Sequence, residues 1–197
     1  MKNIKTLITI SLLFVSVFIS CNVEPEDPLL LYEAEINGGW IAFTKGNFVE
    51  ANLRFQQAIE VDSASAEAYS GLAWVLFKQD SLEKALVMFD SAETMLNPNA
   101  SLLAGHALAL NVVKNYALSN QLAELALKID PAWSFPYLLN LDFNDLIVLK
   151  AENYFMLGNF TQSLREVNRI KPEFVVSLAS PAGIAALAEE IENLKNF

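Results

Sequence analysis

The chain has 197 residues, of which 53% are hydrophobic, and its formal net charge at pH 7 is −10. So acidic a chain lacks the clustered cations that bind a phosphate backbone or an anionic lipid surface, which excludes nucleic acid as an expected partner. Glycine occurs only seven times, while Ala, Leu, Glu and Asn are abundant, and this composition favours helices over a turn-rich β protein.

The first twenty residues have the layout of a secretory signal. Lys2 and Lys5 precede an apolar run from Thr6 to Ile19, and the small Ser20 ends the segment. The run has about 14 residues, too few to span a bilayer core that needs about 20. We therefore expect residues 1–20 to be a removed signal peptide. The remaining 177 residues suffice for one domain and carry 11 basic against 23 acidic side chains, a net charge of −12.

The stretch "FISC" that ends at Cys21 resembles a bacterial lipobox, in which the signal is cut before a cysteine whose thiol carries diacylglycerol. Phe18 stands where that family usually has Leu. The resemblance implies lipidation at Cys21; the alternative is an ordinary signal peptide followed by an isolated cysteine. Asn22, rather than Asp, after the cysteine implies an outer-membrane anchor that faces the periplasm. Residues 21–31 are acidic and contain prolines, which predicts a short extended tether.

The body of the chain repeats with a period of 34 residues. Small residues and turn-forming residues recur in four independent columns, which are Gly39/Ala73/Ala107, Ala51/Ala85/Ser119, Ala58/Ala92/Ala126 and the turns that begin at Gly46/Asp80/Lys114. In the first unit the pattern predicts an inner helix over 32–44 and an outer helix over 48–61, the latter with an apolar stripe at helical spacing. A single helix pair cannot bury such a stripe, whereas stacked pairs can.

These columns resemble the tetratricopeptide repeat, a helix–turn–helix unit of 34 residues. The resemblance implies an all-α solenoid with units at 32–65, 66–99, 100–133 and 144–175. The turn at Gly158 begins 44 residues after the one at Lys114, so ten extra residues precede it. We assign them to an apolar and aromatic insertion, residues 134–143 ("SFPYLLNLDF"), which either lengthens the loop or extends the next helix.

The C-terminal segment, residues 176–197, predicts a capping helix. Ser180 suits an N-cap, Pro181 suits the first helical position, and an apolar face follows at helical spacing. Solenoids need such a terminal cap for solubility. The alternative is a segment that lies in the groove of the solenoid or docks on a partner.

Residues that could support catalysis or metal binding are few. His106 is the only histidine, and one histidine cannot build a zinc site that requires three or four ligands. Neither a Gly-rich dinucleotide motif nor a phosphate-binding loop motif occurs. We therefore expect no catalytic residues, no metal and no cofactor, and we interpret the protein as a non-enzyme in which His106 has a packing role.

Large aromatic residues recur on the predicted inner helices. In tetratricopeptide proteins the corresponding columns commonly line a concave groove, so the resemblance implies an aromatic ladder of Trp40, Phe43, Trp74, Phe77 and Phe155. Lys78 and Asn111 complete the candidate partner-binding groove, with Asn111 replacing an aromatic in the third unit. The alternative is that these rings are core, covered by the neighbouring inner helix or by residues 181–194.

The resulting functional hypothesis is a lipid-anchored adaptor or scaffold in the bacterial envelope that binds a protein or peptide, with a role in outer-membrane or pilus assembly as one expectation. Exposed aromatics are favoured anchors in such interfaces. A carrier that holds an apolar small molecule in the concave pocket is a second hypothesis. A structural envelope protein whose groove is filled by its own chain is a third. The sequence leaves the oligomeric state open.

Overall fold

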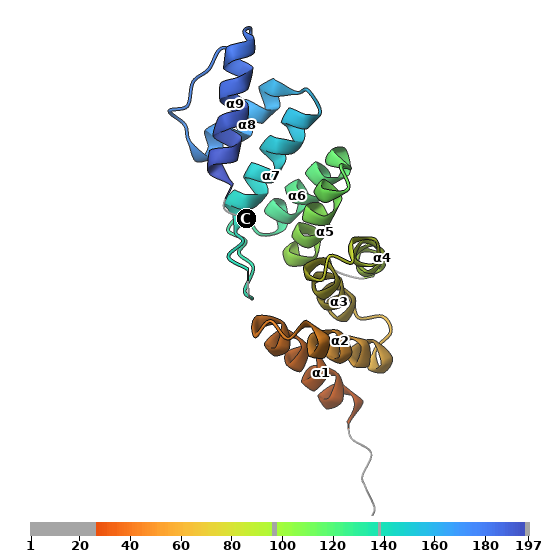
Figure 1. Cartoon of the computed structure of the whole chain (residues 1–197). Helices are drawn as coiled ribbons and strands as arrows, with labels where there is room; N and C mark the ends of the chain where they lie inside the picture. Colours follow the sequence, from red (N-terminus) through yellow and green to blue (C-terminus); the bar gives the residue numbers. More distant parts are fainter. Residues whose placement is uncertain (1–26, 96–97, 138, 196–197) are drawn as a thin grey trace, which may run out of the picture.

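The computed structural model describes residues 27–95, 98–137 and 139–195, and within them the chain forms nine α-helices in a curved array (Figure 1). The signal segment and Cys21 lie outside the described residues. The helices are α1 (Pro28–Thr44), α2 (Phe48–Val61), α3 (Ala66–Lys78), α4 (Leu82–Glu93), α5 (Ala100–Val112), α6 (Tyr116–Ile129), α7 (Phe143–Met156), α8 (Phe160–Ile170) and α9 (Pro181–Leu194).

Consecutive helices pair as α1/α2, α3/α4, α5/α6 and α7/α8, and each pair packs on the next. The odd-numbered helices α1, α3, α5 and α7 also contact one another in turn, so they form one continuous layer. We call the exposed side of this layer the inner face, because it lies on the inside of the bend in Figure 1. The predicted all-α solenoid of helix–turn–helix repeats is therefore confirmed.

The turn within each repeat has the same backbone structure in all four pairs. One residue adopts the left-handed conformation, with φ values of 72° at Gly46, 56° at Asp80, 63° at Lys114 and 73° at Gly158. The following amide donates to a carbonyl five residues earlier, a Schellman arrangement that satisfies the helix C-terminus. The turn column read from the sequence thus marks a conserved geometry within this chain, even where glycine is replaced.

The first helix begins earlier than the sequence analysis predicted. Asp27 accepts a hydrogen bond from the Leu29 amide, and Pro28 occupies the first helical position, where a missing N–H costs nothing. Residues 28–31, which we assigned to the tether, are therefore the first turn of α1.

The insertion lengthens a loop. A capping box between Asp142 and Asp145 starts α7 at Phe143, so residues 134–137 and 139–142 lie outside any helix. Ser134 and Asp142 form an isolated antiparallel bridge, and the Phe135 amide donates to the Leu141 carbonyl at 2.8 Å. The segment therefore leaves the array and returns to it, and in Figure 1 it extends along the inside of the bend.

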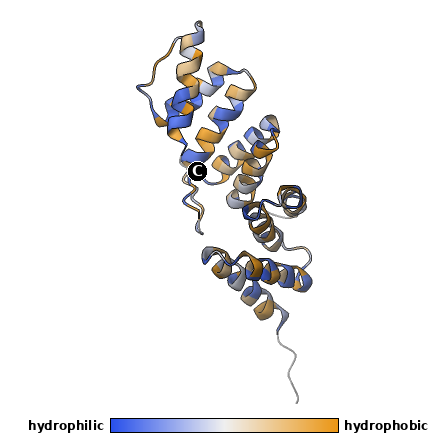
Figure 2. Cartoon of the chain, viewed as in Figure 1, coloured by the Kyte–Doolittle hydropathy of each residue, from blue (hydrophilic) through white to orange (hydrophobic). Residues whose placement is uncertain are grey.

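Hydrophobic and hydrophilic residues alternate along the helices, as amphipathic packing requires (Figure 2). Within the described residues one hydrophobic cluster runs from α1 to α7, and a second joins α7, α8 and α9. Leu187 and Ile191 of α9 are buried in the second cluster. The last helix therefore covers the end of the array, as predicted for a cap, and it lies near Phe155 but not over the aromatic residues of α1 and α3.

Candidate inner-face binding site

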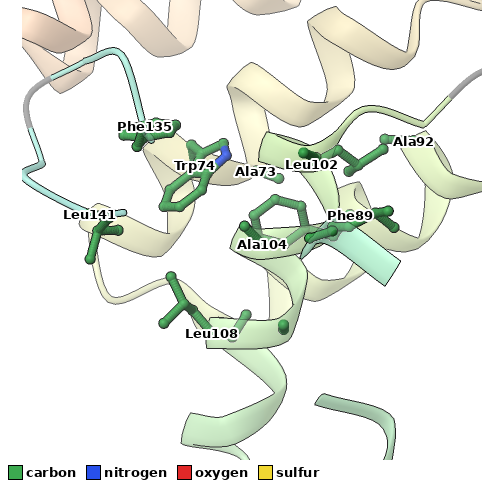
Figure 3. Packing of buried hydrophobic residues seen from close by; sticks show 14 of the residues in the cluster. Ala73, Trp74, Phe89, Ala92, Leu102, Ala104, Leu108, Phe135 and Leu141 are labelled. Carbon is green, nitrogen blue, oxygen red and sulfur yellow. The ribbon is translucent and has the colours of Figure 1, made fainter. Parts of the chain in front are cut away.

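The aromatic residues of α1 and α3 lie together on the inner face, but they are covered. Trp40 is 9% exposed, and Phe43 and Trp74 are fully buried. Part of their cover comes from the insertion, since the Phe135 ring lies 4.2 Å from Trp74, 6.1 Å from Phe43 and 6.2 Å from Trp40 between centroids. Trp40 also packs against Phe55 of α2, and Trp74 against Phe89 of α4. Figure 3 shows Phe135 and Leu141, both from the insertion, beside Trp74.

Tyr137 completes this cover. Its ring stacks on Trp40 at 3.9 Å with an interplanar angle of 3°. Burial, followed by the negative charge of Glu67, raises the pKa of the Tyr137 hydroxyl, so this ring remains a neutral stacking partner at physiological pH. Phe135 and Tyr137 thus add a cover that neither alternative in the sequence analysis considered, while Trp74 also packs against the neighbouring inner helix α5.

The next part of the predicted groove is open. Phe77 is half-buried and Lys78 is exposed, and both line a hollow of about 450 Å³ with Asp80, Leu82 and Val112. Val112 is 55% exposed and occupies the position equivalent to Lys78 in the following repeat. The hollow therefore combines apolar surface with one cationic side chain, Lys78, and one anionic side chain, Asp80.

Asn111 belongs to a polar contact between the third and fourth repeats. Its side-chain amide donates to Asn153 Oδ1 at 2.8 Å, and Asn153 Nδ2 donates to Ser119 Oγ at 2.8 Å and to Asn120 Oδ1 at 3.0 Å. Because Asn153 is fully buried, this network fixes how the two repeats meet. Asn111 therefore has a clear packing role.

Phe155 lies apart from the other predicted ring residues. It is half-buried in the second hydrophobic cluster, with its ring centroid 5.1 Å from that of Phe160. A separate hollow of about 220 Å³ includes Phe155, Met156 and Ile191 of the capping helix. The structure therefore divides the predicted ladder into a covered part, an open part and this distant residue.

His106, the residue that the sequence analysis considered for catalysis or metal binding, is packed in the protein interior. His106 is 2% exposed, its Nδ1 lies 2.5 Å from Glu93 Oε1, and its ring stacks on Phe89. Within the described residues, no group of three or more His, Cys, Asp and Glu side chains is arranged to hold a metal ion. None of the helices seen there combines the length and hydrophobicity needed to cross a bilayer.

Phe135 and Tyr137 are the site residues that the sequence analysis missed. The sequence does contain a signal for these two residues, because the insertion is apolar and aromatic. The surface against which the insertion packs could not be predicted. The 34-residue period describes contacts between neighbouring repeats and gives no information about a loop that follows the third repeat and contacts the first.

The fold and its repeats define the class of protein, an α-solenoid of stacked helix–turn–helix units. No protein-family model matches the sequence, and no curated protein is similar to it in sequence. Solved structures with a similar fold identify the repeat as tetratricopeptide-like. A tetratricopeptide repeat protein from Parabacteroides merdae superposes with a TM-score of 0.58 at 18% identity, over 83% of this chain and 61% of that one.

Two further solved proteins are similar. YrrB, described as a TPR protein with an unusual peptide-binding site, gives a TM-score of 0.60 at 14% identity, covering 82% of this chain and 84% of its own. MamA gives 0.58 at 16% identity, covering 74% and 79%. At such identities these likenesses establish the fold, and this chain spans about three fifths of the Parabacteroides protein.

Proposed function

We propose that this protein is a non-catalytic adaptor that binds a protein or peptide through its inner face. The observation that carries the proposal is the open hollow at Phe77, Lys78 and Val112, which follows the covered aromatic residues along the same layer of helices. An apolar floor beside one cationic and one anionic side chain suits a segment that has an apolar anchor flanked by charged groups. The likeness to YrrB, which is described as having a peptide-binding site, supports the proposal.

We further propose that Cys21 carries a lipid that ties the folded array to a bacterial membrane, with the outer membrane and its periplasmic side as the expected location. The support is the layout of residues 1–21 and the short distance in sequence between Cys21 and the start of α1 at Pro28. Acyl chains contribute about 0.8 kcal/mol per buried CH₂, so more than one chain gives a stable anchor. A role in outer-membrane or pilus assembly follows as one setting for such an adaptor.

A structural role with a self-filled groove is the second candidate. It is favoured by the burial of Trp40, Phe43 and Trp74 beneath the insertion. A carrier of apolar small molecules is less well supported, since the hollows on the inner face are open to solvent rather than enclosed.

The adaptor proposal is tested by changing the charge and polarity of the open hollow while the buried core stays unchanged. Lys78→Glu and Val112→Glu change exposed side chains, so both variants should fold like the wild type. Val49→Glu is the matched control, because Val49 is 78% exposed on the outer helix α2. Each protein is crosslinked in the native envelope, and the crosslinked partners are quantified by mass spectrometry.

We expect one defined set of partners to be lost from both hollow variants and retained by the control. Equal recovery of the same partners by all four proteins would show that the hollow is not the binding site. Absence of any saturable partner in the wild type would favour the structural role.

A further inference from the structure

The insertion places two aromatic side chains on the inner face in the manner of a bound peptide. Phe135 and Tyr137 are two residues apart, so in an extended segment their side chains point the same way. Pro136 between them has a fixed φ and holds the preceding Phe135 in an extended conformation. The two rings contact Trp74 and Trp40, respectively, which come from the two neighbouring inner helices α3 and α1.

This contact depends on side-chain packing, in which the buried Leu141 takes part beside the two rings. Within the described part of the chain, residues 134–142 make no hydrogen bond to α1 or α3; their backbone and bridge contacts stay inside the loop or reach the start of α7. A segment held only by side-chain packing can leave without breaking a hydrogen-bonded ladder. It is attached to the array as a ligand is, through the side chains of Phe135, Tyr137 and Leu141 on a preformed apolar surface.

Trp40, which lies beneath the insertion, also has a polar group, its indole N–H, without a hydrogen-bond partner. Trp40 is 91% buried, as its exposed fraction of 9% implies, and its Nε1 has no hydrogen-bond partner. The other two tryptophans have partners, since Trp74 Nε1 donates to the Ser101 carbonyl at 3.3 Å and Trp133 Nε1 donates to Ser101 Oγ at 3.0 Å. A buried donor without an acceptor is unfavourable, so the insertion is an incomplete occupant of this surface.

Space for a more complete occupant lies beside the stacked pair. A hollow of about 410 Å³ is lined by Trp40 and Tyr137 together with the polar side chains of Asn37, Lys45 and Glu67. An incoming segment can therefore contact Trp40 at this edge before the insertion has left.

We propose that residues 134–142 occupy, as an internal ligand, a binding site on α1 and α3 for an extended partner segment with two aromatic side chains two residues apart and a hydrogen-bond acceptor for the Trp40 indole. The proposal rests on the adaptor function proposed above, and it adds the chemistry of the partner and a means of regulation. Binding of the partner requires the insertion to leave, so the protein presents this part of its inner face only to a segment that outcompetes its own loop.

The strength with which the insertion competes against a separate partner segment follows from its covalent connection to the array. A short loop holds its own segment at an effective concentration in the millimolar range. A separate segment of equal intrinsic affinity therefore binds only the fraction of molecules whose site is open, and its apparent affinity falls by that fraction. Removing the two rings from the loop should raise the apparent affinity by about tenfold or more.

The test uses the whole chain and a fluorescent peptide with the sequence of residues 134–142. The protein variant Phe135→Ala/Tyr137→Ala keeps the loop at its natural length but vacates the site. Fluorescence anisotropy measures peptide binding to this variant and to the wild type, and a peptide with alanine at both aromatic positions is the matched control. Circular dichroism verifies that the variant remains helical.

We expect the aromatic peptide to bind the double variant at least about tenfold more tightly than the wild type, and the alanine peptide to bind neither. If a folded double variant does not bind the peptide, or binds it no better than the wild type does, the insertion is a structural loop and the proposal is wrong. If the double variant does not fold, Tyr137→Ala provides the same test. Tyr137 is only half-buried, so its loss should be tolerated, and unchanged peptide affinity in that variant would equally overturn the proposal.

This outcome is independent of the adaptor test. The peptide experiment reports on the covered surface of α1 and α3, whereas the crosslinking experiment reports on the hollow at Lys78 and Val112. Loss of partner capture in the hollow variants together with failed peptide binding would leave the adaptor function standing without the internal ligand.

Discussion

Replacing Gly105 by alanine tests directly whether the repeats nest as described. Gly105 lies in the middle of α5, and a Cβ placed there would be 2.6 Å from Trp74 Cε2 and 2.7 Å from Phe89 Cζ. Both rings are fully buried, and Phe135 lies on Trp74 as well, so neither ring has free space into which to move. Overpacking of this kind costs about 1–3 kcal/mol, and two rigid neighbours place the cost near the upper end.

Part of this cost is offset, because alanine is about 1 kcal/mol better than glycine inside a helix. We therefore expect Gly105→Ala to lower the free energy of unfolding by about 2 kcal/mol, which corresponds to a fall in Tm of roughly 4–8 °C for a chain of this size. Thermal and urea unfolding followed by circular dichroism measure both quantities.

Gly38→Ala is the matched control. It makes the same change inside α1, but the added Cβ would meet only the flexible Arg54 side chain, at 3.4 Å from its Cδ. We expect this variant to be unchanged or stabilised by up to about 1 kcal/mol. If Gly105→Ala is as stable as Gly38→Ala, Trp74 and Phe89 do not pack against α5 as described. The description of the covered inner face would then be wrong as well.

Three further predictions concern the turns, an ion pair and the anchor. Lys114→Gly should stabilise the protein by about 0.5–1 kcal/mol in urea unfolding, since it relieves a left-handed lysine at φ 63° but adds the entropy cost of glycine; a loss of stability would contradict the turn assignment. The hydrogen bond from Lys150 lowers the pKa of the Glu124 carboxyl, so this group stabilises the fold above its unfolded pKa of about 4.3 and loses that effect as the pH falls through its lower folded pKa. Glu124→Gln should therefore be less stable than the wild type at pH 7, by less than about 1 kcal/mol because Glu124 is largely exposed, and equally stable in strong acid; a difference that grows on acidification would refute this. Cys21→Ser should move the protein from the membrane pellet to the soluble fraction after cell lysis, and continued pelleting would reject the lipid anchor.

The repeat architecture was predictable because its physical cause is local and recurs. Small residues at fixed positions let helices approach, and turn residues end each inner helix, so every unit carries the same information. The chain even keeps the left-handed turn where Asp80 and Lys114 replace glycine, because the surrounding Schellman hydrogen bonds impose it. The start of α1 was missed although Asp27 and Pro28 are standard signals, since the prolines were interpreted as marks of a tether.

The candidate site was predictable only in part. The columns predicted that Trp40 and Trp74 lie on one face of the inner helices, and both contact the insertion, but whether a ring on that face is open depends on contacts between distant segments. Phe135 and Tyr137 reach these tryptophans from a loop that occurs once in the chain, so no internal repetition reveals the contact. The aromatic character of the insertion indicated that it must be buried somewhere, and only the fold shows where.

The third repeat departs from the aromatic pattern of the first two at both inner-face positions. Of the aromatic side chains of the insertion, Phe135 and Tyr137 contact Trp74 and Trp40 of α3 and α1, whereas Phe143 is the first residue of α7. At the position of α5 equivalent to these two tryptophans the chain has Leu108, which is buried. At the position equivalent to Phe43 and Phe77 it has Asn111, whose amide is used in the buried contact with Asn153. An aromatic residue at position 111 would remove a hydrogen bond from the interface between repeats.

The inner face therefore has two parts with different physical chemistry. One part is aromatic and covered by the chain itself, and the other is open and combines Phe77 and Val112 with the opposite charges of Lys78 and Asp80. A partner that uses only the open part needs no rearrangement, whereas a partner that uses both parts must first displace Phe135 and Tyr137. Salt should weaken the first contact through screening of Lys78, while the second should be nearly insensitive to it, because stacking of neutral rings involves no net charge. A marked salt dependence of peptide binding to the Phe135→Ala/Tyr137→Ala variant would contradict this division.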